Sequence, residues 1–290
     1  MSAIYPLYPL HDPMPKAGPD APIGIFDSGI GGLSIAQEIA RYLPKERILY
    51  YADTAHVPYG PREDQNIREL TAHAIEWLYR QGCKIAVVAC NTASAFSLDY
   101  LREHYGENFP IIGLVPALKP AVLQTKSKKV AVLATPATFR GQLIKDVMTR
   151  FAEPAQVEVL TITCLDLVPF VEAGAQMSEA CLATLKEVLQ PAIEQNVDYL
   201  VLGCTHYPFL KGAIQHIFGQ KMTLIDSGAA VARQTARILI KNELLFEHDG
   251  QPEHVRIECY VSGQNADQLK SILSHLIASD LTWSIKNIGI

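Results

Sequence analysis

The chain has 290 residues, of which 49% are hydrophobic and 19% charged, and its formal net charge is −5. That length suits about two domains of a globular protein. The mild acidity, without a stripe of Lys and Arg, gives no support for a nucleic-acid or membrane partner. No apolar stretch approaches the ~18 residues of a membrane-spanning helix. Six cysteines without a CxxC pair argue against a zinc site or a redox motif.

The first 21 residues differ in composition from the rest of the chain. They lack the charged start and apolar segment of a signal peptide. Five prolines interrupt them: Pro6, Pro9, Pro13, Pro15 and Pro19. We interpret residues 1–21 as a flexible leader on a cytoplasmic protein.

Strand and helix patterns alternate after the leader. The first group of strands is predicted at residues 22–26, 47–52 and 83–89, with helices at 33–43, 63–81 and 93–104. The second group of strands is predicted at 129–134, 157–163 and 198–203, with helices at 137–151, 178–195 and 209–218. Such alternation predicts parallel sheets with right-handed crossovers, and therefore an α/β fold with two doubly wound domains.

Two apolar runs repeat each other 114 residues apart. Residues 85–92 and 199–206 each contain an apolar run that ends in a cysteine, Cys90 or Cys204. Polar residues follow the cysteine in both segments. Open α/β sheets bind ligands at the carboxyl ends of their strands, so each cysteine is predicted at a ligand-binding edge. Two thiols at matching places in similar halves would face one small molecule from opposite sides, as a two-base proton transfer requires.

The repetition extends to a second motif and suggests the domain bounds. Residues 25–29 are echoed by residues 224–228, since in both a hydrophobic pair leads into Asp-Ser-Gly. We predict a first domain of residues 22–115 and 228–290 and a second of residues 116–227. The cleft between two such pseudo-symmetric domains is the expected active-site location.

The glycine-rich sequence DSGIGG at residues 27–32 is predicted at a strand-to-helix turn. A nucleotide-binding loop is one alternative, and Asp53 after the second strand keeps it open, although the spacing differs from GxGxxG. The carboxylate of Asp27 argues against an anionic phosphate there. The other alternative is that backbone amides and Ser28 hold a ligand carboxylate while Asp27 orients a catalytic group.

The remaining motifs carry unequal weight. Val57-Pro58-Tyr59-Gly60 is either an ordinary turn with a packed tyrosine or part of a ligand site. Cys90 and Cys204 precede donor-rich residues at predicted helix amino ends, where partial positive charge favours thiolate. The other four cysteines lie among apolar residues and are predicted to be buried.

Four motifs together resemble those of the glutamate racemases, which are cofactor-independent amino-acid racemases with two pseudo-symmetric α/β domains. The motifs are DSGIGG at 27–32, VPYG at 57–60, ACNTAS at 89–94 and GCTHYP at 203–208. Their order and spacing also agree, and the resemblance covers the chain from about Ile23 onward. It implies a racemase that needs neither cofactor nor metal and supplies D-glutamate for peptidoglycan synthesis in the cytoplasm.

The resemblance also assigns roles to residues. It implies that Cys90 deprotonates D-glutamate, that Cys204 deprotonates L-glutamate, and that the other thiol protonates the carbanion. Asp27 would assist Cys90, and His206 would assist Cys204. The residues expected to hold the substrate, besides Asp27 and His206, are Ser28, Tyr59, Gly60, Asn91, Thr92, Thr205, Thr135 and Thr138. Asp53 and Glu172 are interpreted either as residues that support the substrate-contacting side chains from behind or as solvated surface.

Two other classes of function stay open at this point. A cysteine hydrolase would use Cys204 with His206, but it leaves Cys90 unexplained. A two-lobed amino-acid binding protein would make both thiols incidental. Glutamate is the expected small-molecule partner. Because some glutamate racemases with N-terminal leaders respond to a cell-wall nucleotide precursor, such an activator is a candidate partner, as is a second copy of the chain.

Overall fold

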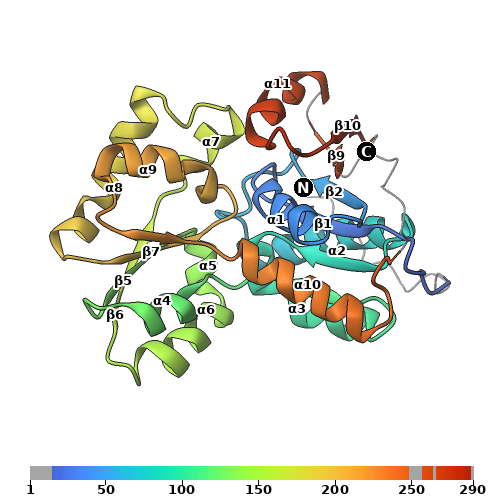
Figure 1. Ribbon diagram of the computed structural model, residues 1–290, viewed down its shortest axis with the longest axis horizontal. Helices are drawn as coiled ribbons and strands as arrows, with labels where there is room; N and C mark the ends of the chain where they lie inside the picture. Colours follow the sequence, from blue (N-terminus) through green and yellow to red (C-terminus); the bar gives the residue numbers. More distant parts are fainter. Residues whose placement is uncertain (1–14, 248–256, 264–265, 289–290) are drawn as a thin grey trace.

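The structure, a computed structural model, describes residues 15–247, 257–263 and 266–288. Within these residues the strands form two sheets, and every strand pairing is parallel (Figure 1). The first sheet has the order β10-β9-β2-β1-β3-β4. Its strands are β1 (Ile23–Asp27), β2 (Ile48–Ala52), β3 (Ile85–Val88), β4 (Ile111–Gly113), β9 (Ile257–Val261) and β10 (Trp283–Asn287). The predicted α/β class with parallel sheets is therefore confirmed.

The second sheet has the order β6-β5-β7-β8 among the described residues. Its strands are β5 (Lys129–Ala134), β6 (Glu158–Thr163), β7 (Tyr199–Gly203) and β8 (Thr223–Ile225). Figure 1 shows this sheet at the left of the view and the first sheet at the right. Parallel strands need crossover connections, and a helix follows most strands in both sheets.

Helices accompany both sheets. The first sheet is accompanied by α1 (Leu33–Tyr42), α2 (Asp64–Arg80), α3 (Asn91–Tyr105), α10 (Gly228–Lys241) and α11 (Ala266–Leu276). The second is accompanied by α4 (Leu118–Gln124), α5 (Pro136–Arg140), α6 (Gln142–Val147), α7 (Leu167–Glu172), α8 (Glu179–Glu194) and α9 (Lys211–Phe218). Successive side chains of a strand point to opposite faces. Ile25 accordingly packs in the cluster that contains α1, whereas its neighbour Phe26 packs in the cluster that contains α2 and α3.

The two sheets match strand for strand around their central strands. β1 lies between β2 and β3, and β5 lies between β6 and β7. β3 therefore corresponds to β7, so Cys90 and Cys204 follow equivalent strands, as the repeated runs predict. The echo of Asp-Ser-Gly does not reflect this symmetry. Asp27 ends β1, whereas Asp226 follows β8, which corresponds to β4 rather than to β1.

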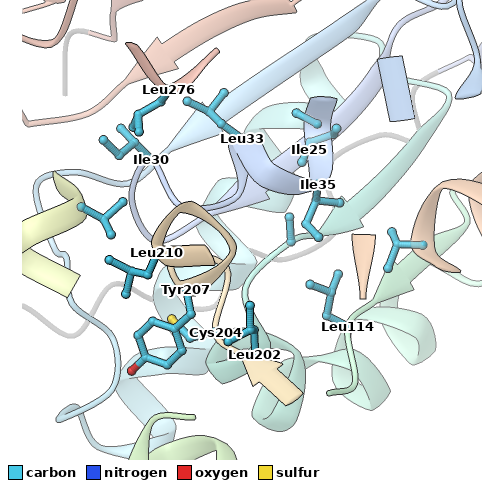
Figure 2. Packing of buried hydrophobic residues seen from close by; sticks show 14 of the residues in the cluster. Ile25, Ile30, Leu33, Ile35, Leu114, Leu202, Cys204, Tyr207, Leu210 and Leu276 are labelled. Atoms are coloured by element: carbon cyan, nitrogen blue, oxygen red, sulfur yellow. The ribbon is translucent and has the colours of Figure 1, made fainter. Parts of the chain in front are cut away.

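One apolar cluster continues from one sheet to the other. Ile30, Leu33 and Leu114, from connections of the first sheet, belong to the same cluster as Leu202 of β7 and Tyr207 of the turn that comes after it (Figure 2). All are buried. Burial of apolar surface contributes about 25 cal/mol per Å², and a cluster shared by both parts stabilises their mutual arrangement.

The C-terminal segment adds strands to the first sheet. β9 pairs with β2 and β10 pairs with β9, while α10 packs against α1. This placement accords with a return of the chain from Gly228 onward, although the domain bounds themselves stay a prediction. Of the predicted leader, residues 1–14 lie outside the described residues, and the carbonyl of Pro19 accepts a hydrogen bond from Lys84 Nζ at 2.5 Å.

Several elements differ from their predicted extents. The helix predicted over residues 137–151 is wrong as a single helix, because α5, α6 and a π-helical turn (Met148–Ala152) replace it. Gly141 separates α5 from α6 with an extended backbone, and a Cβ there would lie 2.5 Å from the Cβ of Ala95 on α3. The short elements β4, α4, α7 and β8 were not predicted. No helix among the described residues is long and apolar enough to cross a membrane.

Candidate functional site

The first thiol lies at the amino end of a helix. Cys90 follows β3 and is the N-cap of α3, where its sulfur accepts the amide N–H of Ala93 at 3.4 Å. The unpaired amides of a helix amino end carry partial positive charge, which favours an anion there. Ser28 Oγ lies 3.6 Å from the same sulfur. The prediction that Cys90 lies at a helix amino end is confirmed.

The second thiol has a different neighbour. Cys204 follows β7, and its sulfur lies 3.7 Å from Nδ1 of His206. A 3₁₀ turn (Tyr207–Leu210) comes next and α9 begins only at Lys211, so the prediction of a helix amino end at Cys204 is wrong. The local sequence offers an imidazole at this thiol in place of helix amides.

A carboxylate contacts the ring nitrogen of His206 that does not face Cys204. Glu172 Oε1, at the end of α7, lies 2.6 Å from His206 Nε2 and also accepts the amide N–H of Ile30 at 2.9 Å. Burial lowers the pKa of His206, but its hydrogen bonds to Cys204 and Glu172 and the negative charge of these groups raise that pKa well above its usual value. The imidazolium form of His206 is therefore favoured beside Cys204.

Asp27 is bonded to the glycine-rich turn and, among the described residues, shares no hydrogen bond with Cys90. Its Oδ2 accepts the amides of Gly29 and Gly32, each at 3.1 Å, and its Oδ1 accepts the hydroxyl of Thr205 at 3.1 Å. Burial raises the pKa of Asp27 to about 6, although the charge of His206 and the two amides lower it. The carboxylate thus joins the end of β1 to the segment that carries Cys204.

The same contacts exclude one interpretation of the turn. Its amides already hold carboxylates, because Gly29 and Gly32 donate to Asp27 and Ile30 donates to Glu172. A phosphate would meet two carboxylates at this position, so the nucleotide-loop alternative is wrong. A ligand carboxylate would meet the same obstacle at these amides, and only Ser28 of this segment lines the cleft.

A small cleft brings the two thiols together. The space open to the centre of a water molecule is about 20 Å³, which suits about one water. Its lining contains both cysteines and most of the predicted substrate residues: Ser28, Val57, Pro58, Tyr59, Gly60, Cys90, Asn91, Thr92, Thr135, Val168, Cys204, Thr205 and His206. The expected convergence of two distant strand ends on one site is thereby observed.

Burial dominates the electrostatics of the first thiol. It raises the pKa of Cys90 to about 12, and the negative charge of Asp27 contributes in the same direction, although the Ala93 amide and the Ser28 hydroxyl lower it. Cys90 is therefore a neutral thiol at neutral pH in this closed cleft. A thiol in that state is suited to donate a proton.

The Tyr59 hydroxyl is already used as a donor within the protein, so it is not available to donate to a ligand. It donates to Asp53 Oδ2 at 2.6 Å. Asp53 also accepts the hydroxyl of Ser262 at 2.7 Å and lies 2.9 Å from Nδ1 of His56. Asp53 is buried, and Glu172 is mostly buried. The alternative of solvated surface is wrong for both, because each accepts hydrogen bonds from side chains or amides of the site.

Hydroxyls form a second link across the cleft. Thr92 Oγ1 on α3 lies 2.8 Å from Thr135 Oγ1, which caps α5 and lies 3.0 Å from Thr138 Oγ1. Thr138 thus stands behind Thr135 and does not line the cleft. Asn91 Oδ1 is buried without a hydrogen-bond partner among the described residues. An unpaired acceptor on a residue of the cleft lining is suited to a ligand ammonium.

Three features of the site were missed from sequence. Val168 of α7 lines the cleft, the Ile30 amide holds Glu172, and Ser262 holds Asp53. An apolar lining residue and a backbone amide carry no chemical signature in a sequence. Among the described residues, no group of three His, Cys, Asp or Glu side chains is arranged to hold a metal ion. Independence from cofactors stays a prediction.

Comparisons with known proteins agree with this site. Residues 23–235 match the family model described as Asp/Glu/Hydantoin racemase. The chain is 56% identical over 265 residues to a glutamate racemase of Deinococcus radiodurans, covering 91% of this chain and 89% of the relative. An Escherichia coli glutamate racemase, solved with L-glutamate and the activator UDP-MurNAc-ala, has a TM-score of 0.78 and 32% identity, and the match covers 92% of this chain and 97% of that one.

A second solved structure has a similar fold. The glutamate racemase of Francisella tularensis in complex with D-glutamate has a TM-score of 0.76 and 29% identity, and the match covers 93% of this chain and 98% of that one. The family match spans most of the chain, and the two thiols lie in one cleft between sheets of matching topology. The chain therefore belongs to the Asp/Glu/hydantoin racemase family and is an amino-acid racemase of the glutamate racemase type.

Proposed function

We propose that this racemase interconverts L- and D-glutamate by two-base proton transfer between Cys90 and Cys204. One cysteine, as thiolate, takes the proton from Cα, and the electron pair stays on the substrate as a carbanion. The other cysteine, as thiol, gives its proton to the opposite face of that carbanion. The observation that carries the proposal is the presence of both thiols in the lining of one small cleft.

The two thiols have environments that suit complementary starting states. Cys90 has a pKa of about 12 in the closed cleft and is a proton donor. Cys204 lies beside His206, whose raised pKa makes the imidazolium available to stabilise a thiolate. These environments favour the direction in which Cys204 removes the α-proton, which by family resemblance is the direction from L-glutamate.

The acidity of the substrate is the main energetic obstacle. Each general base contributes only about 10² to 10⁴-fold, so positioned donors must stabilise the developing charge. The candidate donors on the cleft wall are the hydroxyls of Ser28, Thr92, Thr135 and Thr205, the Asn91 amide group, and the backbone at Tyr59 and Gly60. Asn91 Oδ1 is the candidate acceptor for the substrate ammonium.

The cleft has to widen before this chemistry. A space of about 20 Å³ admits about one water molecule and is too small for glutamate. The contacts that span the cleft are Thr205 to Asp27, Ile30 to Glu172, and Thr92 to Thr135. Their loss on opening and return on closing would exclude water around the carbanion, which strengthens each electrostatic contact.

Racemisation in D₂O tests the proposal directly. We expect product glutamate to carry deuterium at Cα from the first turnover, while recovered substrate early in the reaction keeps mostly protium. A hydrolase would release a cleaved product, and a binding protein would leave both optical rotation and deuterium content unchanged. Product that retained its original protium in D₂O would rule out proton exchange at two solvent-exchangeable thiols.

The wider roles of the enzyme belong to the same proposal. We infer that it supplies D-glutamate for peptidoglycan synthesis in the cytoplasm. The Escherichia coli relative was solved with UDP-MurNAc-ala, described there as an activator, which makes a cell-wall nucleotide precursor the first candidate activator here. Measuring kcat with and without UDP-MurNAc-ala tests that part, and sedimentation of the purified chain tests for a homo-oligomer.

A further inference from the structure

The glycine-rich turn at residues 29–32 faces side chains from the opposite side of the cleft. It follows β1 of the first sheet, whereas His206 follows β7 of the second sheet and Glu172 ends α7. The amides are occupied by Asp27 and Glu172, so the glycines themselves need another explanation.

Backbone conformation does not explain them. Among the described glycines, those with positive φ are Gly82, Gly106, Gly174 and Gly219, and the turn at 29–32 contributes none. Any residue type could adopt the backbone of this turn, so the absence of a side chain is the property to explain.

Gly31 leaves room for the imidazole of His206. A Cβ on Gly31 would lie 2.7 Å from both Cγ and Cε1 of the ring and closer still to Nδ1. Because carbon atoms pack at about 3.5–4.0 Å, the ring would have to move by about 1 Å. Nδ1 is the atom that faces the sulfur of Cys204 at 3.7 Å, so this movement would change the thiol–imidazole contact itself.

Gly29 leaves room for the carboxylate that holds the other side of the ring. A Cβ on Gly29 would lie 3.2 Å from Cδ of Glu172 and closer still to Oε1. The same Oε1 accepts the Ile30 amide and lies 2.6 Å from His206 Nε2. Gly31 therefore limits the position of the imidazole at Nδ1, and Gly29 limits the position of Glu172, which contacts Nε2.

We propose that the turn at residues 29–32 is a positioning element for His206, with Gly31 seating the ring and Gly29 and Ile30 seating Glu172. The Cys204–His206 pair then has its full geometry only when the cleft is closed, because the seat belongs to the opposite side. This inference rests on the proposed role of His206 as the group that assists Cys204.

Gly31→Ala tests the seat. A displacement of about 1 Å costs roughly 10²-fold in rate, so we expect kcat to fall by about that factor while KM changes much less. The pH profile of kcat should also shift, since the imidazole no longer faces the thiol correctly. The matched control is Gly212→Ala on α9, where a Cβ would meet no described atom within 4 Å, and its kcat and pH profile should stay unchanged.

A double variant separates positioning from a general effect on folding. In a His206→Ala background no ring remains to be displaced, so Gly31→Ala should cause no further loss of Cα–H exchange with solvent. Equal losses from Gly31→Ala with and without His206 would overturn the inference. So would a Gly31→Ala enzyme with unchanged kcat and pH profile.

A spectroscopic measurement keeps the inference separate from the proposed function. The ¹⁵N resonances of the His206 ring should shift in Gly31→Ala and should stay in place in Gly212→Ala. Gly29→Ala, the second variant if Gly31→Ala folds poorly, should shift the Nε2 resonance through Glu172. Unmoved resonances would overturn the seat whatever the activity. If the resonances move but His206→Ala keeps full activity, the seat stands and the role assigned to His206 fails.

Discussion

Thr205 donates its hydroxyl to the carboxylate of Asp27 at 3.1 Å, so the residue beside Cys204 is bonded to the residue that ends β1. These residues are 178 positions apart. Asp27 ends β1 of the first sheet, whereas Thr205 comes after β7 of the second sheet. The segment that carries Cys204 is therefore held by a carboxylate from the other side of the cleft.

Replacing either thiol should stop racemisation in both directions. Each cysteine acts as base in one direction and as acid in the other, so Cys90→Ser and Cys204→Ser should each lower kcat by at least about 10²-fold both ways. The double variant should lose little more than either single variant, because the two act as a unit. Optical rotation from each enantiomer measures this. Cys164→Ser, outside the cleft lining, is the control, and near-normal turnover in Cys90→Ser would exclude the two-base assignment.

Asp27 should make the folded state less stable as the pH rises from about 4 to about 6. Burial raises its pKa from the ordinary 3.8 to about 6 in the folded protein, so the folded state binds the proton more tightly than the unfolded state does. The free energy of unfolding should therefore fall by up to about 3 kcal/mol over that range. Asp27→Asn should remove this part of the slope in urea unfolding measured from pH 4 to pH 7. Thr205→Val keeps the carboxylate and removes a donor to its charged form, so it should keep or steepen the slope. An unchanged slope in Asp27→Asn would assign the slope to another group.

The two helpers should affect the two directions differently. If Asp27 assists Cys90, Asp27→Asn should impair proton abstraction from D-glutamate more than from L-glutamate, and His206→Asn should show the opposite bias. The equilibrium constant of a racemase is one, so kcat/KM must fall equally in both directions. The bias can appear only in kcat and KM separately or in isotope effects, which α-deuterated D- and L-glutamate would measure. Symmetric isotope effects in both variants would indicate residues that position substrate rather than one helper for each thiol.

The Tyr59 hydroxyl should matter for stability more than for binding. It donates to the buried carboxylate of Asp53, and loss of one donor to such a group costs about 1–3 kcal/mol. Tyr59→Phe should therefore lower the free energy of unfolding by about that amount and leave the KM for glutamate close to normal. Tyr105→Phe removes a similar bond, to Glu76 at 2.7 Å, away from the cleft, and serves as the matched control. A tenfold rise in KM with unchanged stability would show that the hydroxyl binds the ligand.

Local patterns were sufficient for the parts of the site that lie at strand ends. An apolar run followed by a cysteine identifies a buried strand and its carboxyl edge, and parallel strands bring such edges together. This pattern predicts Cys90 and Cys204 at ligand-binding edges, and both line the cleft. Asn91, Thr92 and Thr205, which the family resemblance implies as substrate residues, line it as well. The same reasoning misassigned the helix amino end at Cys204, because three residues separate the end of β7 from the 3₁₀ turn and α9 begins only at Lys211.

The sequence by itself therefore determined the α/β class, the equivalence of the two thiols and their common cleft, because these depend on short-range hydrophobic patterns and on a repeated motif. Only the tertiary structure decided which groups support them. Glu172 meets Ile30 across 142 positions, and Ser262 meets Asp53 across 209 positions. Hydrogen bonds at such separations leave no local pattern, since a carboxylate on a polar segment looks the same whether it is solvated or buried against an amide. The apparent repeat at Asp226 failed for a related reason: three matching residues describe a turn, and only the order of strands in a sheet shows where that turn lies.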